Sequence, residues 1–188
     1  MRVARRLRWP ALLLAAMVAG CAGSPPPTYS KVPDFTLTER SGHPITRENL
    51  AGQVWVADFI FTRCAGICPT MSANMQKLQQ RLPEEIRLVS FSVDSAYDTP
   101  EVLTEYAKRY EADPERWLFL TGDPAAIQKL SIEGFKLALD PTGGTEAEPI
   151  THSSRFALVD RDGTIRGYFG IEDEDALDRL TAEANKLL

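Results

Sequence analysis

Residues 54–71 read VWVADFIFTRCAGICPTM, and this stretch decides the fold. Its first part, 54–61, is an apolar run of strand length and predicts a buried central strand. Pro69 then suits the first turn of a helix, where its missing N–H costs no hydrogen bond. Cys64 and Cys68 stand four residues apart between these two elements, so the sequence predicts a pair of thiols at a strand-to-helix junction.

The rest of the chain continues this alternation of strands and helices. Thr99 and Asp123 are predicted helix N-caps, each followed by a proline, and Asp162-Gly163 predicts a hairpin turn. The expected strands are 34–38, 86–94, 117–122 and the two arms of 155–170; the expected helices are 69–82, 99–112, 123–135 and 172–188. Parallel units followed by a β-hairpin and a last helix predict a thioredoxin-like α/β fold, with a central mixed sheet flanked by helices.

The cysteine pair suggests metal or redox chemistry. Thiolates are soft ligands and good nucleophiles, so Cys64 and Cys68 can hold Cu(I), close into a disulfide, or do both. Copper(II) prefers added nitrogen ligation, and His152 follows the loop at 140–151 and precedes a strand, which is a suitable place for it. The plainer alternatives are a structural disulfide, or two core thiols with His152 on the surface.

Four other residues lie close to the cysteines in the sequence: Asp58, Arg63, Met71 and Met75. The spacing of Met71 and Met75 is that of a core stripe of the helix rather than of thioether ligands. Asp58, inside the apolar strand, is expected at a solvated strand edge; the alternative is a supporting position near the cysteines. The helix N-terminus, and Arg63 if its side chain folds inward, are expected to favour the thiolate form.

The N-terminus has the pattern of an exported lipoprotein. Four arginines precede an apolar stretch that is too short to span a bilayer, which predicts a signal peptide over residues 1–20. Val18-Ala19-Gly20-Cys21 resembles the bacterial lipoprotein box, which implies lipidation of Cys21. Residues 21–33, with three consecutive prolines, are the predicted tether, and 34–188 are the predicted domain. We expect a bacterial cell-envelope protein that is lipid-anchored to the membrane, with its domain facing the periplasm or the exterior.

Composition limits the partners. Removing the four arginines of the first twenty residues takes the formal charge from −5 to −9, and such a surface repels nucleic acid. Without Cys21, two cysteines remain, an even number that suits an oxidising compartment.

The chain resembles the Sco/SenC family of copper-binding cytochrome c oxidase assembly proteins. The motifs that carry the resemblance are FIFTRCAGICPTM at 59–71, SFSVDSAYDTP at 90–100, HSSRFALVDRDG at 152–163 and GYFG at 167–170. By resemblance, Cys64, Cys68 and His152 bind copper, and the fold is thioredoxin-like. The chain departs from the family pattern at Ala65, Ser95 and Thr151, and none of these departures removes an expected ligand; groups next to the ligands tune the thiol pKa and the metal potential.

Two functions from different classes follow. The first is a copper metallochaperone that assists maturation of the CuA centre, with the oxidase subunit that carries this centre as its partner. The second is a membrane-anchored thiol-disulfide oxidoreductase acting on exported proteins, in which Cys64 and Cys68 form a redox-active pair and His152 is optional. A third candidate, thiol peroxidase activity, lacks the proline and threonine pattern expected before Cys64.

Overall fold

The structure is a computed structural model that describes residues 27–145 and 149–188. The predicted signal peptide, Cys21 and the first part of the predicted tether lie outside the described residues. Within the described ranges, no helix is both long and apolar enough to cross a membrane.

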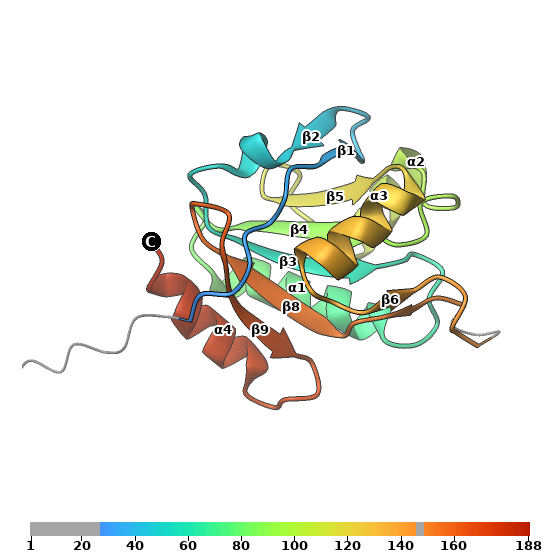
Figure 1. Cartoon of the computed structure of the whole chain (residues 1–188). Helices are drawn as coiled ribbons and strands as arrows, with labels where there is room; N and C mark the ends of the chain where they lie inside the picture. Colours follow the sequence, from blue (N-terminus) through green and yellow to red (C-terminus); the bar gives the residue numbers. More distant parts are fainter. Residues whose placement is uncertain (1–26, 146–148) are drawn as a thin grey trace, which may run out of the picture.

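A mixed β-sheet forms the centre of the described part of the chain (Figure 1). Its strands are β1 (Thr36–Glu39), β2 (Pro44–Thr46), β3 (Trp55–Ile60), β4 (Arg87–Ser92), β5 (Trp117–Thr121), β8 (Arg155–Val159) and β9 (Ile165–Gly170). They lie in the order β2-β1-β5-β4-β3-β8-β9. The three central strands β3, β4 and β5 are parallel, whereas β8 runs antiparallel to β3 and forms a hairpin with β9. The amino end of β8 therefore lies beside the carboxyl end of β3.

Helices cover both faces of this sheet. They are α1 (Cys68–Arg81), α2 (Pro100–Arg109), α3 (Pro124–Lys129) and α4 (Ala176–Asn185), together with a 3₁₀ turn, η1 (Arg47–Leu50), and a π-helix, η2 (Leu130–Gly134). In Figure 1, α3 lies in front of the sheet and α1 passes behind it, where α1 packs against α4. Thr99 and Asp123 accept hydrogen bonds from the backbones of Val102 and Ala126, so both predicted N-caps are confirmed. The thioredoxin-like α/β architecture is likewise confirmed.

The core packs aromatic side chains on both faces of the sheet. The rings of Phe59 and Phe91 stack at 5.0 Å, and Phe135 packs edge-on against Phe59 at 5.3 Å. On the opposite face, Met71 and Met75 of α1 are fully buried. The interpretation of these two methionines as core residues is confirmed.

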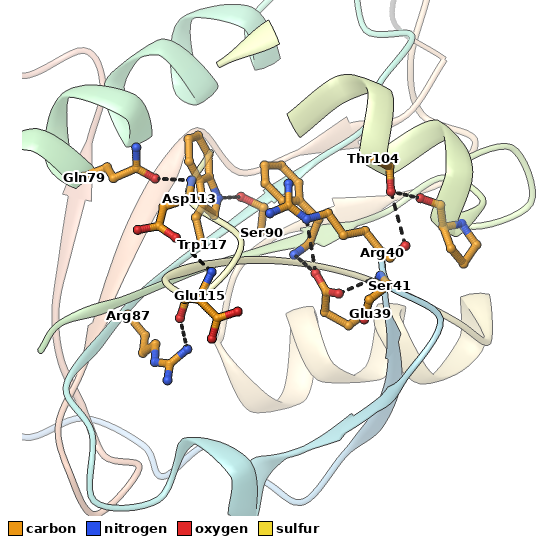
Figure 2. A network of polar contacts seen from close by, with 12 residues as sticks. Glu39, Arg40, Ser41, Gln79, Arg87, Ser90, Thr104, Asp113, Glu115 and Trp117 are labelled. Atoms are coloured by element: carbon orange, nitrogen blue, oxygen red, sulfur yellow. Dashed lines mark hydrogen bonds and ion pairs between the residues drawn. The ribbon is translucent and has the colours of Figure 1, made fainter. Parts of the chain in front are cut away.

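The expectation that Asp58 lies at a solvated strand edge is wrong. β3 is a central strand with neighbours on both sides, so Asp58 is fully buried. The Ser90 hydroxyl donates a hydrogen bond of 2.6 Å to its carboxylate, and the Trp117 indole donates one of 2.9 Å to Ser90 Oγ, which Figure 2 shows. Burial raises the pKa of Asp58 to about 7.

Two segments differ in detail from the sequence-based expectation. The helix expected over 123–135 changes into the π-helix after Lys129, where the Phe135 N–H donates to the Leu130 carbonyl. The loop expected at 140–151 contains part of a two-stranded ribbon, β6 (Leu139–Asp140) and β7 (Thr151–His152). In this ribbon Leu139 pairs with His152, thirteen residues further along the chain. Local sequence patterns do not reveal a pairing over that distance.

The chain packs on the sheet before residue 34. The Tyr29 N–H donates to the Ile165 carbonyl and the Ile165 N–H donates to the Ser30 carbonyl, both at 2.9 Å, so this segment pairs with the outer edge of β9. Val32 is 1% exposed and belongs to the core. The described end of the predicted tether is thus held against the domain, and the predicted domain boundaries stay a prediction.

Candidate metal centre

The loop between β3 and α1 carries both cysteines. The Cys64 N–H donates to the Phe61 carbonyl at 3.3 Å, which folds the chain into a turn directly after the strand. Cys68 is the first residue of α1, and Pro69 follows it as predicted. Both side chains are free thiols; Cys68 is fully buried and Cys64 is 7% exposed. The pair therefore lies at the boundary between the core and the surface, with Cys64 on the outer side.

A buried carboxylate on the neighbouring loop fixes this turn. Asp98 accepts hydrogen bonds from the Thr62 backbone N–H at 3.0 Å, from the Thr62 hydroxyl at 2.5 Å and from the Ser92 hydroxyl at 2.5 Å. Thr62 lies two residues before Cys64. Asp98 was not predicted as a site residue from the sequence. The signal that could have found it is an acidic residue in the loop after the neighbouring parallel strand, because such loops meet at one edge of the sheet.

His152 reaches the cysteines because of the strand topology. It pairs with Leu139 in the β6–β7 ribbon, and the Ser153 N–H donates to the Ala138 carbonyl at 3.0 Å. β8 begins three residues later, next to the carboxyl end of β3. The imidazole packs edge-on against the Phe61 ring, with 5.7 Å between the ring centres. The ribbon and the aromatic contact together restrict where the imidazole can point.

The structure brings the three predicted residues together. The two sulfur atoms and a ring nitrogen of His152 all lie within 4.8 Å of one another, and Cys68 Sγ is 3.2 Å from His152 Nε2. The other ring nitrogen, Nδ1, is 3.1 Å from the Ser153 carbonyl. Because a carbonyl oxygen only accepts hydrogen bonds, Nδ1 carries the proton in this contact, which leaves Nε2 of a neutral ring free to offer its lone pair toward the sulfur.

The expected bias toward thiolate is wrong for Cys68. Burial raises the pKa of the Cys68 thiol far above its ordinary value, because the enclosed site disfavours the charged thiolate. Arg63 does not turn inward either. Its Nε lies 2.5 Å from Asp94 Oδ2, and its guanidinium stacks on the ring of Tyr97. Binding of a cation by the Cys68 sulfur therefore has to displace its proton.

Two sulfurs and one imidazole nitrogen form a soft donor set. Such a set suits copper, because thiolates stabilise Cu(I) and the imidazole nitrogen is also a good ligand for Cu(II). Among the histidine, cysteine and acidic side chains of residues 27–145 and 149–188, these three lie close enough together to hold a metal ion. The hydrogen bond from Nδ1 to the backbone also orients the ring, as outer partners of metal-bound histidines commonly do.

Comparison with known proteins identifies the family. The SCO1/SenC family model matches residues 24–188, and the chain belongs to this family. The crystal structure of a SCO1/SenC family lipoprotein from Bacillus anthracis has a TM-score of 0.76 at 32% identity; the match covers 84% of this chain and 95% of that one.

Two further structures carry functional information about relatives. BsSco, a member of the Sco family of cytochrome c oxidase assembly proteins with an identified disulfide switch, has a TM-score of 0.72 at 35% identity, and the match covers 87% of this chain and 97% of BsSco. ScoI from Bradyrhizobium japonicum, solved with copper bound, has a TM-score of 0.70 at 25% identity, with 85% of this chain and 100% of ScoI covered.

Proposed function

We propose that this chain is a copper metallochaperone that binds copper through Cys64, Cys68 and His152 and passes it to the CuA centre of cytochrome c oxidase. The observation that carries the proposal is the convergence of two sulfurs and a ring nitrogen within 4.8 Å. Membership of the SCO1/SenC family supports the choice of copper and of the oxidase, since one relative was solved with copper and another belongs to the oxidase assembly proteins.

The three ligands contribute differently to the cycle. Cys64 and Cys68 supply the negative charge and the soft sulfur donors that retain Cu(I), and both give up their protons as copper binds. His152 supplies the nitrogen donor from a separate ribbon, so the site accommodates Cu(II) as well. Release to an acceptor proceeds by exchange of these ligands for those of the acceptor. Cys64, on the outer side of the pair, is the accessible starting point for that exchange.

Membrane attachment belongs to the same proposal. Lipidation at Cys21 would hold the domain at the outer side of the membrane, in the cell envelope, where the CuA-bearing subunit is the partner. The similarity to a family lipoprotein supports this anchor.

The first prediction separates the histidine from the cysteines. His152→Ala should bind Cu(II) at least about tenfold more weakly than the parent, because only the two sulfurs remain. Absorbance titration of the reduced proteins with Cu(II) measures this through the sulfur-to-copper charge-transfer band. The control is His43→Ala, whose histidine lies on the exposed turn before β2. If the parent and His152→Ala show the same weak band, or both show no band, the support for a copper site here is removed.

The second prediction concerns the sulfur pair. Cys64→Ser and Cys68→Ser should each abolish tight retention of Cu(I), because one thiolate does not replace two. Competition with a Cu(I) chelator of known affinity provides the measurement. Retention at the parent affinity in either variant would mean that other ligands hold the metal.

A second candidate function, thiol-disulfide exchange, is favoured by the same short separation of two free thiols. Bound copper and a closed disulfide exclude each other at one cysteine pair, so metal content and thiol titre distinguish the two functions. Protein isolated from the cell envelope should contain one copper per chain if delivery is the function. Copper-free protein that cycles between dithiol and disulfide with a partner would establish exchange instead.

A further inference from the structure

The surface beside the metal centre presents a tyrosine in a fixed orientation. Tyr97, in the loop between β4 and α2, is 51% exposed. Its backbone N–H donates to the Asp94 carbonyl at 2.9 Å, and the guanidinium of Arg63 lies 5.0 Å from the centre of its ring. Asp94 in turn holds Arg63 through the ion pair described above. An exposed aromatic ring restrained in this way loses little conformational freedom when a partner covers it.

This ring borders a hollow of about 530 Å³ on the protein surface. Its lining combines the apolar or aromatic side chains of Tyr97, Val102 and Tyr106 with Thr62 and with four charged side chains, those of Arg63, Glu101, Glu105 and Arg109. The two arginines and two glutamates of the lining balance in formal charge; of these, Arg63 pairs with Asp94, and Glu105 pairs with Lys108 at 2.6 Å. The hollow therefore suits an apolar side chain better than an ion.

The hollow adjoins the segments that carry both cysteines. Arg63 directly precedes Cys64 in the loop. On the other side, the hydroxyl of Tyr106 forms a hydrogen bond of 2.8 Å with Ser72, which lies one helical turn after Cys68. A group seated in the hollow thus touches Arg63, the residue before Cys64, and Tyr106, which is hydrogen-bonded to the helix that begins at Cys68.

We propose that the protein that accepts copper docks at this hollow and inserts an apolar side chain between Tyr97 and Val102. The inference rests on the proposed function. Copper passes by ligand exchange only when the ligands of the acceptor reach bonding distance of the metal, so the acceptor has to cover the surroundings of the centre. Tyrosine and arginine are the residues enriched at energetically important positions of interfaces, and here they form one restrained unit beside Cys64.

The test uses the full chain in detergent, loaded with copper, and the copper-free soluble domain that carries the CuA site. The rate of copper transfer at low protein concentration is followed through the absorbance of the CuA centre. Tyr97→Ala and Val102→Lys should each lower this rate at least about tenfold and leave the copper affinity within about twofold of the parent. The matched control is Tyr29→Ala, an equally exposed tyrosine that packs on Tyr168 at the opposite end of the sheet.

The outcomes separate this inference from the proposed function. Parent rates in both Tyr97→Ala and Val102→Lys, with copper delivered normally, would overturn the docking site and leave the metallochaperone function standing. An equal loss in Tyr29→Ala would also overturn it. If the parent binds copper but transfers none to the CuA domain, the delivery function fails and the docking site fails with it. Unchanged copper affinity and unchanged thermal unfolding of the variants show that they fold as the parent does.

Discussion

Asp58 is a carboxyl group in the interior of the sheet. Ser90 donates to one of its oxygens, whereas the other, Oδ2, is buried without a hydrogen-bond partner. Water would solvate the ionised form far better than this environment does, which is why the pKa of Asp58 rises from an ordinary value of 3.8 to about 7. The folded protein therefore keeps a proton on Asp58 that the unfolded chain releases.

This difference predicts how stability depends on pH. Between about pH 4 and pH 7 the unfolded state has lost the Asp58 proton and the folded state retains it, so the free energy of unfolding falls as pH rises. Asp58→Asn keeps an acceptor for Ser90 and cannot ionise. Its stability relative to the parent should increase by about 2 to 3 kcal/mol between pH 5 and pH 8. Urea unfolding of both reduced proteins tests this, and a difference that stays constant with pH would contradict it.

At the scale of elements, the conformation of the β3–α1 loop, which carries the cysteines, depends on hydrogen bonds to the loop after β4. Asp98 accepts hydrogen bonds from both the backbone and the hydroxyl of Thr62, and the Asp98 carboxylate is fully buried. Asp98→Ala should lower the free energy of unfolding by about 3 kcal/mol, since Thr62 and Ser92 lose their acceptor. It should also weaken copper binding, because the turn before Cys64 is no longer fixed.

Urea unfolding and copper titration check this prediction. The matched control is Asp94→Asn, which loses only the ion pair with the half-exposed Arg63 and should cost clearly less stability. A smaller effect of Asp98→Ala than of Asp94→Asn would contradict the anchoring role of Asp98.

Elements with local signals could be predicted from the sequence. Thr99 and Asp123 mark helix starts through hydrogen bonds to residues three positions on, and Gly163 adopts a positive φ of 79° in the predicted hairpin turn. The β6–β7 ribbon could not be predicted, because its pairing joins short segments across a long loop. The burial of Asp58 was missed for a related reason: a carboxylate is usually solvated, and the groups that surround this one, Ser90 and Trp117, come from other strands.

At the scale of the whole molecule, the site is a product of topology. The chemistry of cysteine and histidine, together with the family resemblance, indicated Cys64, Cys68 and His152 from the sequence. Cys68 and His152 are 84 residues apart in the sequence. They meet because β8 lies antiparallel to β3, which places the start of β8 beside the end of β3. The orientation of the imidazole and the pairing of Arg63 with Asp94 depend on side-chain packing, which the sequence alone does not specify.

The proposed copper function requires that three side chains, from the β3–α1 loop, α1 and the β6–β7 ribbon, bind one copper ion. X-ray absorption spectroscopy of the copper-loaded chain at the copper edge tests this most directly. The predicted result for Cu(II) is a shell with two sulfur donors and at least one imidazole nitrogen, and loss of the imidazole contribution in His152→Ala. A shell of oxygen and nitrogen donors without sulfur, or one unchanged in His152→Ala, would contradict it.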